Sequence, residues 1–224
     1  MTRTTLPELP QQDFAAFLFD MDGTLLTSIK AAERVWGNWA ASHGLDVAAF
    51  LPTIHGKRTE DTVRGLDLPG VDAAAEAARI TRAEIEDVAG VEAIRGAAAF
   101  LASLPPGQWA IVTSAPRKLA EARIAAAGMP LPGVLVAAED VERGKPAPDP
   151  FLLGARELGV APEDCLVFED TLAGLRSAAA AGMQGIVVTT THAHPLETEV
   201  PGVLDYEELR AIVTSSGKLQ ISKK

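Results

Sequence analysis

The sequence has one cysteine in 224 residues, and a lone thiol excludes an internal disulfide. Cys165 stands before an apolar Leu-Val-Phe run, which predicts a buried core thiol rather than a catalytic one. Long hydrophobic runs are also absent, because none approaches the roughly 18 residues that a membrane-spanning helix needs. The polar, proline-containing first 12 residues lack the apolar segment of a secretory signal peptide. We therefore expect a cytoplasmic protein without a membrane partner.

Basic residues are outnumbered, since 20 Lys and Arg face 30 Asp and Glu for a net charge of −10. A nucleic-acid partner is not expected, because phosphate backbones are bound by basic surfaces. Hydrophobic residues make up 47% and charged residues 22%, which is typical of a globular protein with a substantial core. The length suits one domain with a sizeable insertion. A monomer is the simplest expectation for the assembly.

Five short apolar runs alternate with helical patterns along most of the chain. Glycines follow the helical segments, at the position where glycine often ends a helix. Strands that alternate with helices predict an α/β fold, with a parallel sheet covered on both faces. The expected strands are Phe14–Phe19, Trp109–Thr113, Val134–Ala137, Cys165–Phe168 and Ile186–Thr190, and the expected helices include Arg117–Ala127, Pro150–Leu158 and Leu172–Ala181.

Residues 28 to about 92 break this alternation, because they show helical patterns and no convincing strand. Ile29–Ser42 carries Trp36 and Trp39, and Val71–Val88 is rich in Ala, Glu and Arg. We therefore predict an all-helical insertion in this interval. The two tryptophans are expected in its core rather than stacked on a ligand.

Asp20 and Asp22 follow the first predicted strand, at a glycine-containing turn. Ligand sites in parallel α/β sheets lie at the carboxyl ends of strands, where these two acids are expected. Two carboxylates so close together repel unless a cation neutralises them. The pair suits covalent phosphoryl chemistry, in which one carboxylate attacks phosphorus and the other moves the proton. A calcium loop is excluded, because Leu25 and Ala31 stand where it needs Gly and Glu, and a plain turn is the remaining alternative.

Three further strand ends carry polar residues that phosphoryl chemistry needs. Thr113 and Ser114 supply hydroxyls that hydrogen-bond phosphate oxygens, although such residues are also common in turns. Lys145 lies between glycine and proline ahead of a helix, where a fixed ammonium offsets negative charge. Glu169 and Asp170 offer hard oxygen ligands suited to Mg²⁺, and helix capping is the alternative for Asp170. Together these residues predict a phosphate site that contains a metal.

The four motifs, in this order, resemble the haloacid dehalogenase superfamily in its phosphatase branch, over roughly residues 14 to 213. The matching residues are Asp20, Asp22 and Thr24 for the first motif, Thr113 for the second, Lys145 for the third, and Glu169, Asp170 and Gly174 for the fourth. The resemblance implies a Rossmann-like, doubly wound parallel core from residues 1–27 and 92–224, with a helical cap at 28–91. Bacterial sugar phosphatases, including glycerol-phosphate and 2-deoxyglucose-phosphate phosphatases, show similar patterns.

The resemblance also implies a reaction. Asp20 attacks phosphorus to give an aspartyl-phosphate, and Asp22 protonates the leaving alcohol and then deprotonates the hydrolytic water. The residues expected to bind the phosphoryl oxygens are Thr113, Ser114 and Lys145. Those expected to hold Mg²⁺ are Asp20, Asp170, Asp22 through its main-chain carbonyl, and Glu169 through water. The implied activity is Mg²⁺-dependent hydrolysis of a phosphomonoester.

The expected cap would close over the site, exclude water and supply specificity. The cap segment that reaches the substrate in relatives matches His55, Gly56, Lys57 and Arg58, for which a solvated basic turn is the alternative. Ser28 lies at the hinge and is also expected near the substrate. The implied partner is a small phosphorylated sugar or polyol, with hexose, hexitol and glycerol phosphates all compatible.

Related branches of the superfamily differ at single positions. Dehalogenases lack the second acid, so Asp22 disfavours dehalogenation. P-type ATPases carry lysine where Met21 stands. A sugar-phosphate mutase of the β-phosphoglucomutase type carries a cap histidine at the position of Ala32, which weakens this first alternative. A non-catalytic binding protein with the same fold is the second alternative, which the complete set of motif residues disfavours.

Weaker patterns lie outside the motifs. Leu209–Val213 and Leu219–Ser222 flank a Thr-Ser-Ser-Gly-Lys turn and predict a terminal hairpin. His192 and His194 follow the last predicted strand, and a pair without a third ligand indicates a solvated loop rather than a metal site. Arg95 replaces a proline that many relatives carry, a change expected to affect the stiffness of the cap hinge.

Overall fold

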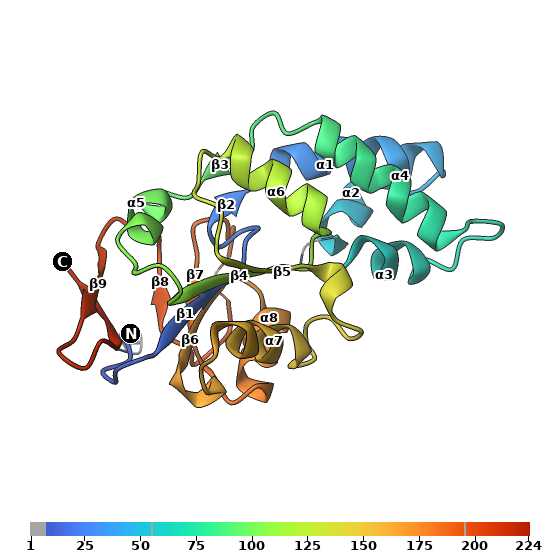
Figure 1. Ribbon diagram of the computed structural model, residues 1–224. Helices are drawn as coiled ribbons and strands as arrows, with labels where there is room; N and C mark the ends of the chain where they lie inside the picture. Colours follow the sequence, from blue (N-terminus) through green and yellow to red (C-terminus); the bar gives the residue numbers. More distant parts are fainter. Residues whose placement is uncertain (1–7, 55, 195) are drawn as a thin grey trace, which may run out of the picture.

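The computed structural model describes residues 8–54, 56–194 and 196–224 and is centred on a six-stranded sheet (Figure 1). The strand order is β5-β4-β1-β6-β7-β8 and every neighbouring pair is parallel, which confirms the predicted α/β fold. Strand order reverses beside β1, at the kind of switch point where open α/β sheets bind ligands. The strands are β1 (Ala16–Phe19), β4 (Trp109–Val112), β5 (Val134–Val136), β6 (Cys165–Glu169), β7 (Gln184–Val188) and β8 (Gly202–Val203).

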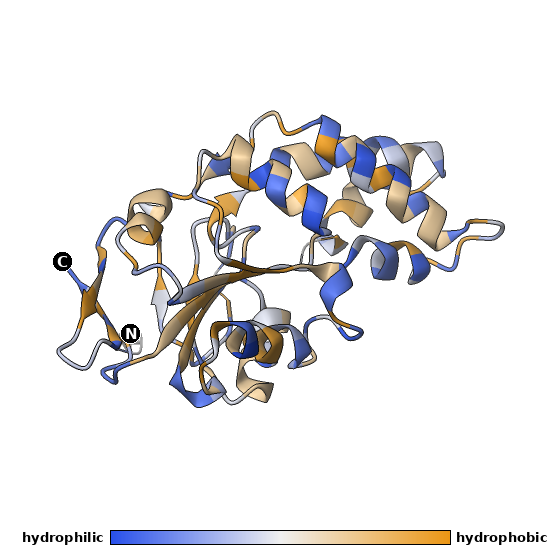
Figure 2. Ribbon diagram, in the orientation of Figure 1, coloured by the Kyte–Doolittle hydropathy of each residue, from blue (hydrophilic) through white to orange (hydrophobic). Residues whose placement is uncertain are grey.

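Side chains of β1 alternate between two apolar cores. Phe17 and Phe19 contribute to one core, and Ala16 and Leu18 contribute to the other. All four are fully buried, which explains the uninterrupted apolar run in the sequence. Figure 2 shows the apolar strands with helices on both sides. The covering helices are α5 (Ala97–Ala102) and α6 (Arg117–Ala126) on the Phe17 side, and α7 (Asp149–Leu158) and α8 (Leu172–Ala180) on the Leu18 side.

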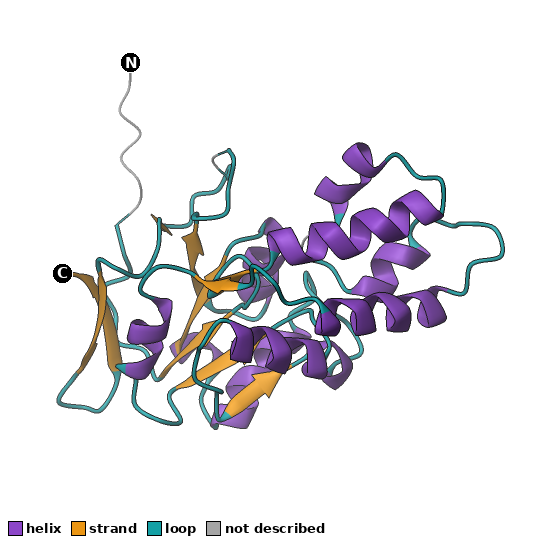
Figure 3. Cartoon of the chain, turned by 90° about the horizontal axis from the view of Figure 1, so that it is seen from above, coloured by secondary structure: helices purple, strands orange, loops and turns teal. Residues whose placement is uncertain are grey.

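A helical insert, defined here as α1 to α4 with η1, separates two short strands that pair antiparallel. Most of its buried side chains form a cluster of their own that includes Trp36, Trp39 and Phe50, which confirms the predicted place of the tryptophans. Figure 3 shows the insert at one end of the molecule. The bounds are β2 (Leu26–Thr27), α1 (Ile29–Ser42), α2 (Val47–Phe50), η1 (Leu51–Thr53), α3 (Thr59–Arg64), α4 (Ala73–Glu86) and β3 (Glu92–Ala93). The division at residues 27/28 and 91/92 stays a prediction.

Local capping explains where α4, one of the two longest helices of the insert, begins. Asp72 Oδ1 accepts hydrogen bonds from the backbone N–H groups of Ala74 at 3.0 Å and Ala75 at 3.1 Å. An aspartate in this position stabilises a helix start by about 1 kcal/mol. The core side of α4 then presents Ala77, Ile80 and Glu84 to the interior, and Glu84 is an unusual residue for that face.

The C-terminal part combines a confirmed and a missed element. The predicted hairpin is present as β9 (Leu209–Val213) and β10 (Leu219–Lys223), and Leu219 pairs with Phe14 beside the sheet. Strand β8 was not predicted, because two residues are too short for a hydrophobic period. Two 3₁₀ turns complete the core: η2 (Ala138–Asp140) and η3 (Pro162–Asp164).

Cys165 begins β6 and is fully buried, as predicted. Burial raises the pKa of its thiol to about 12, so the thiolate needed for nucleophilic attack does not form near neutral pH. Among the described residues, the helices all fall short of the length and hydrophobicity that crossing a membrane requires.

Candidate active site

Asp20 and Glu169 lie together because β1 and β6 are paired in register, and the residues just before them are partners. Lys145, in the loop before α7, reaches between the two carboxylates. Its Nζ donates to Asp20 Oδ1 at 2.6 Å, to Glu169 Oε1 at 2.7 Å and to the Val112 carbonyl at 3.0 Å. All three ammonium donors therefore have an acceptor, and only 2% of the lysine side chain is exposed.

Burial is the main cause that raises the pKa of Asp20 to about 7, and Glu169 adds to the rise while Lys145 opposes it. Burial alone would lower the pKa of Lys145, but its two acidic partners raise that pKa above the usual value. The pair therefore combines a carboxylate that titrates near neutral pH with a lysine that keeps its charge.

The Glu169 carboxylate is held by the protein on both oxygens. Lys145 contacts Oε1, and Oε2 accepts from the backbone N–H groups of Asp170 at 2.8 Å and Thr171 at 2.7 Å. Gly174 explains the glycine of the fourth motif, because a Cβ there would lie 1.6 Å from Glu169 Oε1. Glu169 thus acts as an anchor for Lys145 and for the turn that carries Asp170.

Asp170 lies over the turn that follows β1. A Cβ at Gly23 would lie 1.9 Å from Asp170 Oδ2, and the φ of +90° at Gly23 also requires glycine. Among the described residues, the hydrogen-bond donor of its carboxylate is the Thr24 hydroxyl, at a long 3.4 Å. Burial raises the pKa of Asp170, and the neighbouring acids Glu169 and Asp20 add to the effect.

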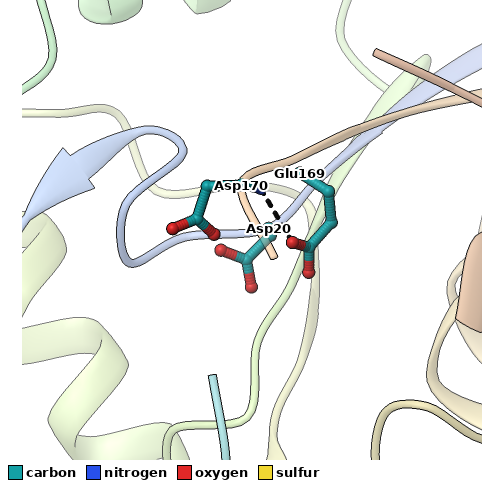
Figure 4. Close-up of side chains that lie close together, drawn as sticks. All are labelled: Asp20, Glu169 and Asp170. Atoms are coloured by element: carbon teal, nitrogen blue, oxygen red, sulfur yellow. Dashed lines mark hydrogen bonds between the residues drawn. The ribbon is translucent and has the colours of Figure 1, made fainter. Parts of the chain in front are cut away.

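Asp20, Glu169 and Asp170 form a compact acidic group (Figure 4). One oxygen from each lies within 4.8 Å of the others. Three carboxylates beside one lysine leave a net negative charge in a buried place, which a hard cation offsets. The free oxygens of Asp170 and Asp20 fit such an ion, and the group can hold a metal.

Thr113 and Ser114 leave β4 on the opposite side of Asp20 from Glu169, and both line the same pocket. The Thr113 hydroxyl accepts from the Ala115 N–H at 3.0 Å. Ser114 Oγ donates to the Gly56 carbonyl of the insert at 3.5 Å. The strand ends therefore supply hydroxyls to the pocket, as the motif order suggested.

The insert covers the pocket with a mixed set of residues. Gly56 and Lys57 line it, together with Trp36 and Ile54. Arg58 points elsewhere: its guanidinium donates to the main-chain carbonyls of the loop that precedes Lys145, those of Val141 at 2.8 Å and Glu142 at 3.0 Å. His55 lies outside the described residues.

Ser28 and Asp22 contact each other at the base of the insert. Ser28 Oγ donates to Asp22 Oδ1 at 2.6 Å, and both residues line the pocket. Ser28 therefore holds a carboxylate as well as bordering the pocket.

Arg123 and Glu84 also line the pocket, and the sequence analysis did not single them out. Arg123 contacts both Asp22 and Glu84 at 2.9 Å. A signal was present, because Arg123 lies one turn after Leu119, on the buried side of α6 beside Ala120 and Ile124. A charged residue on an apolar helix face is unusual, and it marks a buried partner.

The predicted solvated loop at the histidines is wrong for His192 and fits His194, which is exposed. His192 is half-buried, and its Nε2 lies 2.7 Å from the Asp170 carbonyl, to which it donates. Its imidazole therefore supports the turn that presents Asp170. Arg95 also has a structural partner, since it donates to Asp205 Oδ2 at 2.6 Å.

The model of the haloacid dehalogenase-like hydrolase family matches residues 14–182, and the chain belongs to this family. Hexitol phosphatase A of Escherichia coli (strain K12) is 46% identical over 193 residues, covering 84% of this chain and 89% of its own. Fructose-1-phosphate phosphatase YqaB of the same strain is 31% identical over 188 residues, covering 78% and 96%. The enzyme is therefore a phosphatase-type member, as its motifs indicated.

A solved structure of the same fold supports this family assignment. The CbbY protein of Rhodobacter sphaeroides, determined in complex with phosphate, superposes with a TM-score of 0.70 at 27% identity. The superposition covers 87% of this chain and 96% of that one. The order of the core strands and the helical insert thus belong to a known architecture.

Proposed function

We propose that this protein is a Mg²⁺-dependent phosphatase of small polyol or sugar phosphates, with hexitol phosphates as the leading candidates. The observation that carries the proposal is the buried Asp20, which Lys145 holds at 2.6 Å in a pocket that Asp22 also lines. A fixed carboxylate can act as the nucleophile, and a second carboxylate nearby can transfer the proton.

In this mechanism, Asp20 attacks the phosphorus of the substrate with a carboxylate oxygen. Asp22 gives its proton to the leaving alcohol as the phosphorus–oxygen bond breaks, and an aspartyl-phosphate remains on Asp20. Asp22, now a carboxylate, takes a proton from a water molecule that attacks the same phosphorus. Inorganic phosphate leaves, and Asp20 and protonated Asp22 are regenerated.

The phosphoryl group would be held by Thr113, Ser114 and Lys145. Lys145 keeps its charge beside Asp20, so it offsets the negative charge that gathers on the phosphoryl oxygens. The hydroxyls of Thr113 and Ser114 border the same pocket from the neighbouring strand end. Preorganised donors of this kind stabilise the transition state without moving during the reaction.

The residues that would hold Mg²⁺ are Asp20 and Asp170 through their carboxylates, Asp22 through its main-chain carbonyl, and Glu169 at longer range. The hydrogen bonds of Glu169 support its more distant place, because one of its oxygens already contacts Lys145 and the other accepts from the turn that carries Asp170. When bound, the ion would lower the repulsion between an anionic nucleophile and an anionic phosphate.

The helical insert would act as the cap of this enzyme, with residues 28–91 as its extent. Lys57 lines the pocket from the insert and is the residue best placed to select the substrate, with Gly56 beside it. Arg58 would act indirectly, through its contacts with the loop before Lys145. Ser28 would border the leaving group through its contact with Asp22.

Three observations favour hydrolysis of a polyol phosphate. The hexitol phosphatase named above covers most of this chain at 46% identity. Ala32 lines the pocket at the position where the mutase relatives carry a cap histidine. This chain therefore lacks the cap histidine that a mutase of that type would have. The charged side chain of Lys57, which lines the pocket, also suits a substrate with several hydroxyls.

Phosphate release from a panel of phosphomonoesters tests the proposal. The panel would contain sorbitol 6-phosphate, mannitol 1-phosphate, fructose 1-phosphate, glucose 1- and 6-phosphates and glycerol 3-phosphate, each with Mg²⁺ and with EDTA. We expect metal-dependent release that is fastest on one or two hexitol phosphates. Interconversion of glucose 1- and 6-phosphates without release would establish a mutase instead. A folded protein that is inactive on every ester would refute both enzymatic assignments.

A further inference from the structure

Arg123 is a buried charge of the core that contacts two carboxylates. It lies on α6, and 8% of its side chain is exposed. Its Nη1 donates to Asp22 Oδ2 at 2.9 Å, and its Nη2 donates to Glu84 Oε1 at 2.9 Å. Glu84 belongs to α4 of the helical insert and is 4% exposed. One guanidinium therefore connects the core, the insert and a pocket carboxylate.

The two helices that carry this contact lie side by side, as Figure 1 shows for α4 and α6. A guanidinium suits the role because its nitrogens form a rigid fork, so that two separate carboxylates can be held at once. Because both charges are buried, separating Arg123 from Glu84 without exposing them to water is strongly unfavourable. Glu84 therefore holds Arg123 in place only while α4 lies against α6.

Asp22 is oriented by residues that lie outside its own turn. Ser28 Oγ donates to one carboxylate oxygen at 2.6 Å, and Arg123 donates to the other. The Asp22 side chain remains 27% exposed and borders the pocket. Asp20 differs, because its partner is Lys145 of the core.

We propose that Arg123 is a positioning residue that aims the Asp22 carboxyl group at the leaving group, and that Glu84 holds Arg123 there when the insert covers the site. Asp22 would then be in place for proton transfer only with the insert closed. Neither Arg123 nor Glu84 touches the reacting atoms. Both act through Asp22.

This inference rests on the proposed function and makes a specific kinetic prediction. An alkoxide is a poor leaving group, so the phosphorus–oxygen bond of an alkyl phosphate breaks readily only if the proton of Asp22 moves to that oxygen. The phenolate of an aryl phosphate whose phenol has a low pKa can leave without being protonated. A misaimed Asp22 therefore slows alkyl esters far more than activated aryl esters.

The experiment compares kcat/KM of Arg123→Met, Arg123→Lys and Glu84→Gln with that of the wild-type enzyme. The substrates are a series of aryl phosphates with leaving groups of increasing pKa, followed by the best hexitol phosphate. We expect Arg123→Met to lower kcat/KM at least about 100-fold on the hexitol ester and less than about 10-fold on 4-nitrophenyl phosphate. Arg123→Lys should recover part of the loss, and Glu84→Gln should show the same pattern more weakly.

Arg58→Met is the matched control, because Arg58 also joins the insert to the core but does not contact Asp22. It should slow all esters by one common factor. The same common factor for Arg123→Met and Glu84→Gln would overturn the positioning role and leave the phosphatase standing. Circular dichroism checks folding, and if Arg123→Met does not fold, the lysine and glutamine variants decide. A wild-type enzyme without activity on any ester would refute the proposed function instead.

Discussion

Asp20 and Glu169 line the floor of the pocket, where both accept from Lys145 Nζ, which also donates to the Val112 carbonyl, at 2.6 to 3.0 Å. The roof, which the insert forms, lines the pocket with Trp36, Ile54, Lys57 and other side chains. The floor is formed by the ends of three neighbouring strands of one sheet. Its charged groups Asp20, Lys145 and Glu169 hold one another, and their described side-chain hydrogen bonds are all with residues of the core.

The roof is joined to the floor by a small number of polar contacts. Arg58 reaches two carbonyls of the loop before Lys145, Glu84 reaches Arg123, and Gly56 accepts from Ser114. Most apolar packing inside the insert forms a cluster of its own, and Ala31 of α1 and Ile85 of α4 join it to one core of the sheet. We therefore propose that the strand ends hold the nucleophile, while the insert sets access and specificity and, through Glu84 and Arg123, the orientation of Asp22.

Replacing Asp20, the proposed nucleophile at the floor of the pocket, is expected to have the largest effect on kcat. Asp20→Asn keeps the size and polarity of the side chain but removes the attacking carboxylate, so kcat should fall at least about 10⁴-fold. Phosphate release from the best substrate and from 4-nitrophenyl phosphate measures it. Metal-dependent turnover that persists on both esters would rule out the covalent mechanism.

The same substitution should stabilise the metal-free protein at neutral and alkaline pH. Asp20 faces Lys145, Glu169, Asp22 and Asp170, and burial raises its pKa from 3.8 to about 7. The folded protein thus binds more protons than the unfolded chain between these values, so the free energy of unfolding of the wild type falls as pH rises through this window. The Asp20→Asn variant has no carboxyl group to titrate here, so its free energy of unfolding should not fall for this reason.

Thermal unfolding in EDTA, from pH 4 to pH 9, measures this effect. The variant should match the wild type near pH 4 and exceed it above pH 7, by at most about 4 kcal/mol for a pKa difference of this size. A wild type that is more stable than the variant at pH 8 would mean that Lys145 favours the ionised carboxylate more than burial disfavours it.

The sequence pointed to the floor because its residues obey a simple rule. Asp20, Thr113 and Glu169 each stand at the end of an apolar run, and a parallel sheet brings such ends to one edge. The run also makes each strand recognisable by itself. The fold class, the terminal hairpin and the core tryptophans of the insert followed from patterns of the same local kind.

The contacts of the roof with the core follow no such rule. Arg123 meets Glu84 across 39 residues and Asp22 across 101 residues, and both meetings depend on how two helices pack. Helix period shows that Arg123 lies on a buried face, but it does not show which carboxylate lies opposite. His192 was missed for the same reason, since its partner is a main-chain carbonyl of another loop.

Among the roof residues, Lys57 is expected to change substrate choice with little effect on the chemical step. It lines the pocket beside Gly56, so Lys57→Ala should lower kcat/KM about 10-fold on the best hexitol phosphate, the size expected for one hydrogen bond from a charged group. Its effect on 4-nitrophenyl phosphate should be within about twofold. Lys57→Met, which keeps the apolar stem, separates lost charge from lost packing. Equal losses on both esters would assign Lys57 to the phosphoryl group instead of the polyol.

The smallest effect should come from inside the roof, away from the pocket. Trp39 packs in the core of the insert, and its Nε1 donates to Glu76 Oε2 at 2.7 Å. Trp39→Phe removes this hydrogen bond and should destabilise the protein by about 1 kcal/mol. Because Trp39 does not line the pocket, kcat/KM should stay within about twofold of the wild type on both esters. Urea unfolding and the paired kinetic assays measure the two quantities. A selective loss on the hexitol ester would show that packing inside the insert also sets the shape of the pocket, so that roof stability and specificity could not be separated.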